Sequence, residues 1–193
     1  MYKKLLGIAL IFSFTSAVAD DLSYNFVELG YVKAELDDDL AGFDVDGDGF
    51  GIRGSFEINE AFFVALDYSA LGFDFGVDLD QLSAGVGYHG AMTSGADFFA
   101  VLSYLRAEVS ASGFGSADED GFGATVGVRG MLTDKVELNG RIGYADLGDG
   151  ADGTSFGAGA LYSFTDAFAL GFDIEIDEDV TVYGLGGRFY FGN

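Results

Sequence analysis

Residues 50–58 read FGIRGSFEI, and this stretch decides the fold that the sequence predicts. Its side chains alternate in character from one position to the next, which is the period of a β-strand and not of a helix. Arg53 and Glu57 share one face with glycine and serine. The other face carries four large apolar side chains, those of Phe50, Ile52, Phe56 and Ile58. The segment is therefore predicted to be a strand with one apolar face and one polar, charged face.

The same alternation recurs along the chain, between clusters of Gly, Asp and Ser. Ten stretches follow it: Leu22–Leu36, Phe50–Ile58, Ala61–Leu71, Asp80–His89, Asp97–Val109, Gly121–Met131, Val136–Ala145, Ser155–Phe164, Ala167–Ile176 and Val180–Phe191. The charges stand on the Gly-rich face, as they do where a strand turns its apolar face to lipid. In lipid only a closed sheet satisfies the backbone groups of every strand. We therefore predict an all-β fold, a closed antiparallel up-and-down transmembrane barrel of ten strands. Eight strands is the alternative, and it requires the weakly patterned Asp97–Val109 or the hairpin around Asp177 to be something else.

The composition agrees with a barrel and excludes other classes of protein. The 193 residues include 31 Gly, no Pro and no Cys, and the formal net charge is −23. A chain without Pro suits an unbroken ladder of backbone hydrogen bonds, whereas this much Gly disfavours helices. The acidity excludes a nucleic-acid partner, which would require clustered Lys and Arg. After residue 19 no apolar stretch approaches the ~20 residues of a transmembrane helix.

The connections between the predicted strands are of two alternating kinds. The short ones are Asn59-Glu60, Leu132–Lys135 and Thr165-Asp166, with a modest one at Gly90–Ala96. The long ones, rich in Asp and Gly, are Asp37–Gly49, Gly72–Leu79, Ser110–Asp120 and Asp146–Thr154. This rhythm is typical of short periplasmic turns and long outer loops, and only Asp177–Asp179 breaks it by being short. Both termini are therefore expected on the periplasmic side.

The N-terminal residues carry the pattern of a secretory signal peptide. Lys3 and Lys4 precede an apolar run from Leu5 to Phe14, which is too short to span a bilayer, and Ala17–Ala19 forms an A-x-A cleavage site. We expect residues 1–19 to be removed after export through the Sec pathway. Residues 20–193 then form the barrel.

The two ends of the predicted barrel resemble a known family. The last strand has aromatic or apolar residues at alternate positions: Tyr183, Leu185, Phe189 and Phe191. Together with the start LSYNFVE at residues 22–28, the chain resembles the small outer-membrane β-barrel proteins related to OmpX and to the transmembrane part of OmpA, in a porin family of Gram-negative bacteria. The resemblance implies a bacterial outer-membrane location and recognition of those four side chains by the barrel-assembly machinery. It also implies a monomer surrounded by outer-membrane lipid and lipopolysaccharide.

The sharpest local motif is a run of alternate carboxylates, Asp44, Asp46 and Asp48, followed by Gly49. This D-x-D-x-D-G spacing matches the first half of a calcium loop. The bidentate Glu expected at the twelfth position is missing, and Ser55 stands there. The motif is either a solvated acidic loop or a weak site for calcium or magnesium. No other cofactor is expected.

Charges on the inward faces form the second candidate site. They are Arg53, Arg129, Arg141, Arg188, Glu28, Glu57, Asp67, Glu137, Asp173 and Glu175. A charge in a narrow lumen is costly unless it is paired. Closure makes the first and last strands neighbours, so we predict an ion-pair ladder Arg188–Glu28–Arg53–Asp67. Phe26 shares the face of Glu28 and argues against this register. The charges are either a structural plug or the lining of a narrow ion path.

The function indicated by these residues is not enzymatic. With one His and no Cys, few nucleophile–base arrangements are possible, and His89 is expected near the periplasmic rim as a lumenal hydrogen-bonding residue. We expect a barrel that contributes to envelope integrity or to surface interaction with an unknown extracellular ligand through acidic outer loops. The alternative is a small passive channel for ions or small solutes.

Overall fold

The structure, a computed structural model, describes residues 22–36, 45–93, 95–148 and 152–192. The described residues form ten strands and one short 3₁₀ turn, Asp74–Gly76. The strands are β1 Phe26–Leu36, β2 Asp46–Asn59, β3 Phe62–Phe73, β4 Val77–Thr93, β5 Ala96–Ala111, β6 Gly115–Thr133, β7 Val136–Asp146, β8 Asp152–Thr165, β9 Phe168–Ile176 and β10 Val180–Tyr190. Among these residues no helix is long and apolar enough to cross a bilayer. The predicted signal peptide, residues 1–19, lies outside the described residues.

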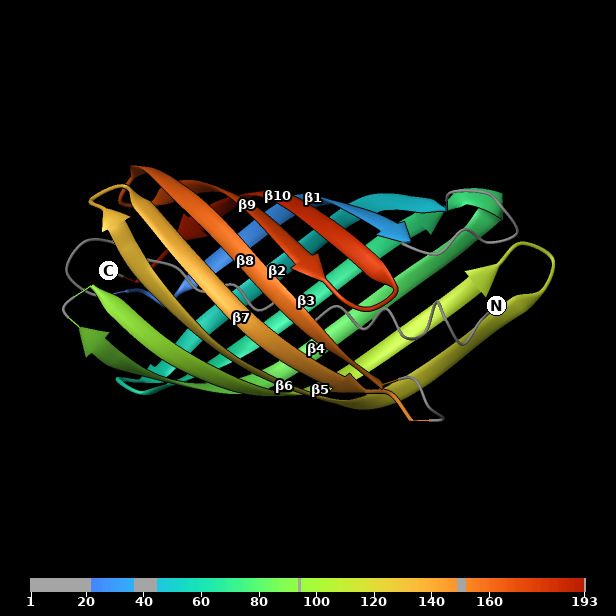
Figure 1. Ribbon diagram of the computed structural model, residues 1–193, viewed down its shortest axis with the longest axis horizontal. Helices are drawn as coiled ribbons and strands as arrows, with labels where there is room; N and C mark the ends of the chain where they lie inside the picture. The colour runs from blue at the N-terminus through green and yellow to red at the C-terminus, as the bar shows by residue number, and fades with distance from the viewer. Residues whose placement is uncertain (1–21, 37–44, 94, 149–151, 193) are drawn as a thin grey trace.

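Every strand pairs antiparallel with its neighbours in the chain, and β1 pairs with β10, so the sheet closes into a barrel with inclined strands (Figure 1). The prediction of ten strands is confirmed. The eight-strand alternative is wrong, because β5 pairs along its whole length with β4 and β6. The hairpin around Asp177 is also real, since the backbone N–H of Asp177 donates to the carbonyl of Val180 at 2.9 Å.

The two faces of the sheet divide as the alternation predicts. In β1, Leu29 is 62% exposed on the outside, whereas Glu28 is 9% exposed in the lumen. Phe26 is also fully buried in the lumen. Its place on the same face as Glu28 therefore does not argue against the register predicted for β1. β1 begins at Phe26 and not at Leu22, because Tyr190, the last residue of β10, pairs with Phe26 and leaves residues 22–25 without a partner strand on that side.

The end of the barrel that holds the described start of the chain, which we call the turn end, has four tight turns of one design. Each turn follows a register shift in the strand that enters it. At each shift an Asn or Thr side chain accepts hydrogen bonds from the turn backbone, as Asn59 Oδ1 does from the N–H groups of Ala61 and Phe62 at 3.0 and 3.1 Å. Thr93, Thr133 and Thr165 occupy the same place in the other three turns. The connection expected at Gly90–Ala96 is therefore shorter than predicted.

The opposite end, which we call the hairpin end, differs from the prediction. The long loops expected at Gly72–Leu79 and Ser110–Asp120 are largely strand, because β3 pairs with β4 as far as Phe73–Val77 and β5 with β6 as far as Ala111–Gly115. Backbone ladders need no apolar side chains, so Asp- and Gly-rich sequence can continue a hairpin beyond the lipid. In Ser110–Asp120 the alternation of large apolar side chains ends, and near Gly72–Leu79 it moves to the inward face with Phe73, Val77 and Leu79, so the sequence pattern missed the continuation.

Glycines make room in the lumen for large side chains on neighbouring strands. A Cβ atom added at Gly186 would lie 3.0 Å from Glu28 Oε1, and one added at Gly157 would lie 2.5 Å from the Arg141 guanidinium carbon. At Gly87 and Gly127 an added Cβ would clash with the rings of Phe63 and Phe99. The Gly-rich inward face therefore has a packing role: it accommodates the charges and rings of the lumen.

The lumen is layered from the turn end to the hairpin end. Aromatic side chains, with Tyr24, Phe63 and Phe99 among the most buried, lie nearest the turns. The ion-pair ladder lies above them. Near the hairpin end the inward side chains are apolar and buried: Val32, Ala34, Val45, Leu71, Phe73, Val77, Leu79, Leu105, Ala107, Val109, Ala145, Leu147, Val180 and Val182. The sequence pattern predicted a polar inward face throughout and missed this apolar layer.

Candidate functional site

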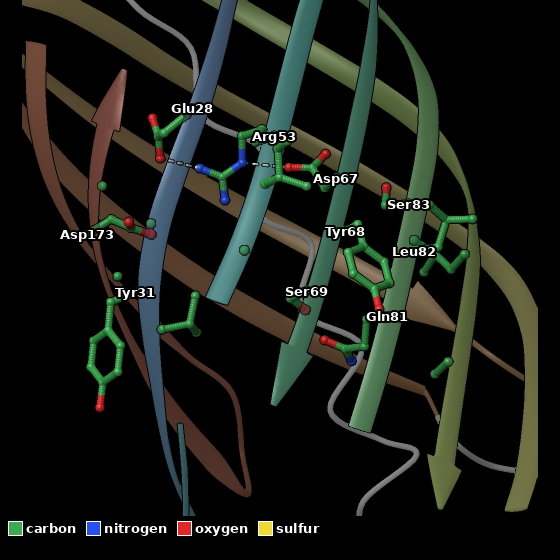
Figure 2. Close-up of a pocket in the computed structure, with 18 of the residues that line it drawn as sticks. Glu28, Tyr31, Arg53, Asp67, Tyr68, Ser69, Gln81, Leu82, Ser83 and Asp173 are labelled. Carbon is green, nitrogen blue, oxygen red and sulfur yellow. Dashed lines mark hydrogen bonds and ion pairs between the residues drawn. The ribbon is translucent and has the colours of Figure 1, made fainter. Parts of the chain in front are cut away.

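Four charged side chains from adjacent strands form a continuous ladder in the order expected from the sequence. Arg188 Nε donates to Glu28 Oε2 at 2.7 Å. Arg53 Nη1 contacts Glu28 Oε1 at 3.1 Å, and Arg53 Nε donates to Asp67 Oδ1 at 2.5 Å (Figure 2). Each of these pairs is also a directly opposed pair in the strand register. The two arginine forks thus neutralise two carboxylates that the sheet holds at one level.

Arg188 is the most buried member of the ladder, with no exposed surface. Its guanidinium carbon lies 4.0 Å from the centroid of the Phe26 ring, in the geometry of a cation–π contact. Phe26 therefore stabilises the Arg188 cation with a second contact, in addition to the ion pair with Glu28. This explains why an aromatic side chain faces the lumen of β1.

A second group of charges adjoins the ladder, on β7 and β9. Arg141 Nη2 lies 2.6 Å from Glu175 Oε2 and 3.3 Å from Asp173 Oδ1. All three side chains are buried. Arg141 therefore satisfies two carboxylates at once, a role for which its planar fork is suited.

A third group spans the lumen near the turn end. Tyr24 precedes β1, yet its ring lies under the Arg129 guanidinium at 4.5 Å, and Arg129 is on β6, the strand farthest from β1 in the barrel order. Arg129 Nε lies 3.1 Å from Glu137 Oε1, and Tyr24 donates to Asp97 Oδ2 at 3.3 Å. The sequence pattern identified Arg129 and Glu137 but missed Tyr24 and Asp97. Tyr24 shares the face of Glu28 in the predicted stretch Leu22–Leu36, but alternation along one strand does not show that its ring reaches Arg129 across the lumen.

His89 joins this third group at the rim, where it was expected. Its ring stacks on Tyr24 with 3.9 Å between centroids, and its Nδ1 lies 3.5 Å from Asp97 Oδ2. Glu57, also predicted to face inward, accepts a hydrogen bond from Asn25 Nδ2 at 2.7 Å. Contacts between the side chains of these three groups extend through the lumen from mid-barrel toward the turn end.

A cavity of about 50 Å³ lies between the ladder and the apolar layer (Figure 2). Asp67 and Arg53 line the side of the cavity toward the turn end, at the top of Figure 2, and Ser69 and Gln81 line its wall. Gln81 is 8% exposed, and neither of its amide atoms has a hydrogen-bond partner among the described protein groups. The cavity is therefore polar on this side, and its volume accommodates water.

The predicted calcium motif is not a loop. Asp46 and Asp48 belong to β2, where both face outward, and Asp44 lies outside the described residues. Lys33 Nζ contacts Asp46 Oδ2 at 3.3 Å. Side chains two positions apart in a strand are separated by about 7 Å, too far for the convergent ligands of a calcium loop. Within the described residues no group of three His, Cys, Asp or Glu side chains has the geometry of a metal site.

The four residues expected to signal assembly lie on the last strand or directly after it. Leu185 and Phe189 are exposed on the outer face, at 51% and 56%, and Tyr183 is half-buried. Phe191 follows β10, and its N–H donates to the carbonyl of Asn25 at 3.1 Å. The outer face of β10 thus presents an alternating apolar row, as the sequence predicts.

Comparison with known proteins identifies the class to which this barrel belongs. The sequence pattern of the outer membrane protein β-barrel domain matches residues 6–164, and the chain therefore belongs to that family. No curated protein sequence matches the chain. The protein is a bacterial outer-membrane β-barrel. In such barrels the short turns face the periplasm and the longer connections the exterior, so we take the turn end as periplasmic and the hairpin end as extracellular.

Solved structures with the same fold include proteins of different activities. An outer membrane channel from Pseudomonas putida F1 is 12% identical, with a TM-score of 0.57 over 93% of this chain and all of that chain. The KdgM porin is 10% identical, with a TM-score of 0.50 over 86% of this chain and 99% of that chain. The translocator domain of the autotransporter NalP from Neisseria meningitidis is 12% identical, with a TM-score of 0.50 over 90% of this chain and 91% of that chain. At such identities the likeness concerns the fold alone.

Proposed function

We propose that this protein is a non-enzymatic barrel with a closed lumen, and that it contributes to envelope integrity or surface interaction through its acidic extracellular surface. The observation that carries the proposal is the contact of Tyr24 with Arg129, which joins opposite sides of the lumen. Closely paired charges such as Arg53 and Asp67 reinforce it. A solute would have to break these contacts to pass, at a cost typical of separating buried charges.

The outward surface near the extracellular end supports a role outside the lumen. Tyr68 donates to Asp80 at 2.6 Å, and Tyr104 donates to Asp120 at 2.5 Å, so tyrosine rings on the outer face hold carboxylates there, as aromatic side chains at a membrane interface could. Divalent cations would bridge such carboxylates to the phosphates of lipopolysaccharide. We propose that the protein is a monomeric barrel whose partners at this surface are lipopolysaccharide and the surrounding lipid. It would reach the outer membrane through Sec export and the barrel-assembly machinery.

The placement of His89 supports a non-enzymatic role. It is the chain's one histidine, and its ring stacks on Tyr24 in the lumen at the periplasmic rim. Its near neighbours are the carboxylates of Asp97 and Glu57. We therefore propose a structural role for His89, which orients Tyr24 and Asp97.

Two measurements test the proposal. Purified barrel in planar bilayers should show no discrete conductance steps, and steady single-channel currents would contradict a closed lumen. Deletion of the gene should increase detergent sensitivity or reduce surface attachment. A deletion strain with unchanged permeability, attachment and detergent sensitivity would contradict the surface role.

A narrow channel is the second candidate function, and the cavity at Gln81 favours it. The two unpartnered amide atoms of Gln81 and the hydroxyl of Ser69 line a polar space directly above the charge ladder. Water in that space would extend a polar path from the ladder toward the extracellular end. A small conductance that Gln81→Leu abolishes would favour the channel over the closed barrel.

A further inference from the structure

Two extracellular turns present aromatic side chains to solvent, and the first does so in a strained conformation. Phe75, in the turn Asp74–Gly76 between β3 and β4, has φ 64° and ψ 17°. A bulky side chain rarely adopts this left-handed conformation, and such strain concentrates at functional sites. The ring is 75% exposed, so intramolecular packing does not offset the strain.

The second turn, between β5 and β6, presents Phe114 in a similar way. Phe114 is 84% exposed and stands between two glycines with positive φ, Gly113 at 86° and Gly115 at 87°. The β5–β6 hairpin extends farthest at the extracellular end of the barrel, on the right of Figure 1. The backbone N–H of Ser112 in this turn donates to the carbonyl of Gly76 at 3.1 Å, which fixes the two turns to each other. We call Phe75 and Phe114 together the aromatic tips.

The surroundings of the aromatic tips are acidic. Asp74 and Asp78 flank Phe75, and β6 carries Asp118, Glu119 and Asp120 as it runs back from the Phe114 turn, Asp118 being the nearest of the three along the strand. The nearest cation, Arg106, already contacts Asp118 at 3.0 Å and Asp120 at 3.8 Å. The remaining carboxylates leave this surface negative around its two rings.

We propose that the aromatic tips dock a protein surface in which basic side chains surround an apolar pocket. The rings supply apolar area that is exposed in the free protein, and aromatic side chains are the usual anchors of such interfaces. The surrounding carboxylates select a basic partner and steer its approach. Without a bridging divalent cation, the same carboxylates would repel an anionic lipid surface. The proposal rests on the proposed surface role and names the site and the partner chemistry for it.

Matched synthetic peptides test the proposal. The probes are three fluorescent peptides of equal length that combine Lys with Phe, Lys with Ser, or Glu with Phe. Binding is measured by anisotropy to the full barrel in nanodiscs of uncharged lipid, with empty nanodiscs as the blank. The Lys–Phe peptide should bind about tenfold more tightly than either of the others, as expected if one ring contributes the energy of a single buried aromatic contact.

The variants decide whether the aromatic tips carry the binding. Phe75→Ser combined with Phe114→Ser should weaken Lys–Phe binding about tenfold, whereas Leu132→Ser, which removes an exposed apolar side chain at the periplasmic end, should leave it unchanged. A heat-dependent shift on SDS gels verifies that each variant is folded. Equal binding to the double variant, equal binding of the Glu–Phe peptide, or tighter association with anionic vesicles than with the Lys–Phe peptide would each overturn the proposal.

A complementation experiment separates this proposal from the proposed function. If a gene for the double variant corrects every defect of the deletion strain, the aromatic tips are not the docking site, yet the surface role stands. If the deletion strain has no phenotype at all, the proposed function fails, whereas the peptide measurements still judge the docking site. Loss of surface attachment alone in the double variant supports the docking site.

Discussion

Glu28 and Arg188 stand directly opposite each other at the seam where the first and last strands meet. They are 160 positions apart in the chain, and Arg188 contacts Glu28 Oε2 from Nε at 2.7 Å and from Nη2 at 2.6 Å. Arg53 joins the same carboxylate from β2. Glu28 therefore links both strands that flank β1, and closure of the barrel brings it to Arg188.

Replacing Glu28 by Gln should destabilise the barrel by roughly 3–5 kcal/mol, because it leaves buried Arg188 without its carboxylate, and by less if water enters the lumen. The loss of stability is measured as a lower urea midpoint of unfolding, followed by far-UV circular dichroism. Glu60→Gln, at an exposed turn position, is the matched control and should leave the midpoint unchanged. An equal midpoint for Glu28→Gln and Glu60→Gln would show that the seam pair contributes nothing.

Gly186→Ala should also weaken the seam, although it changes no charge. The new Cβ would lie 3.0 Å from Glu28 Oε1 and 3.2 Å from its Cγ, so the carboxylate must move away from Arg188. We expect a loss of about 1–3 kcal/mol, as for overpacked sites. Gly54→Ala is the control, since the nearest atom to its added Cβ lies 3.9 Å away. Equal stability of the two variants would contradict the tight fit around Glu28.

Tyr24→Ala should open the periplasmic half of the lumen. The substitution removes the ring that lies between Arg129 and His89. Planar-bilayer recordings should show small conductance steps that the native barrel lacks. Tyr162→Ala, which removes a ring on the lipid face, should conduct no better than the native protein. A Tyr24→Ala barrel that stays silent while folded would place the barrier elsewhere.

Phe191→Ala should reduce assembly more than stability. Phe191 follows the last strand, where the resemblance to outer-membrane barrels predicts recognition by the assembly machinery. We expect lower amounts in purified outer membranes and more degradation in the periplasm. Phe156→Ala, an exposed aromatic position on β8, is the control and should assemble normally. Native abundance of the Phe191→Ala protein would refute the assembly role.

Calcium should bind weakly to the acidic extracellular surface, because closely spaced carboxylates repel one another and a divalent cation relieves the repulsion. Asp46 and Asp48 extend outward from β2, and Asp44 precedes them in the sequence. Isothermal titration should give a calcium heat that decreases in a variant with all three changed to Asn. If the heats of the native and triple-variant proteins coincide, these carboxylates do not bind the cation.

Much of the candidate site was predictable because a strand has a period of two residues. That period places Glu28, Arg53, Asp67 and Arg188 on one face of their strands, and closure makes β10 the neighbour of β1. Tight periplasmic turns set the relative heights of residues in each hairpin. The register of the strands and the order of neighbouring strands are together sufficient to order the residues of the ladder. No local feature of the sequence, however, distinguishes Phe26 as a ring that faces the lumen.

The amino-acid sequence by itself determined the barrel, its ten strands and the sides on which its charges lie, since alternation and short turns are local properties. Only the tertiary structure decided which side chains meet across the lumen, such as Tyr24 with Arg129, because the inclination and stagger of the strands set that distance. It also decided how far the Asp- and Gly-rich hairpins continue, because backbone pairing there depends on the neighbouring strand and not on an apolar pattern. The conformation of Phe75 follows from the same cause: the paired strands on either side leave its turn only a few residues in which to reverse direction.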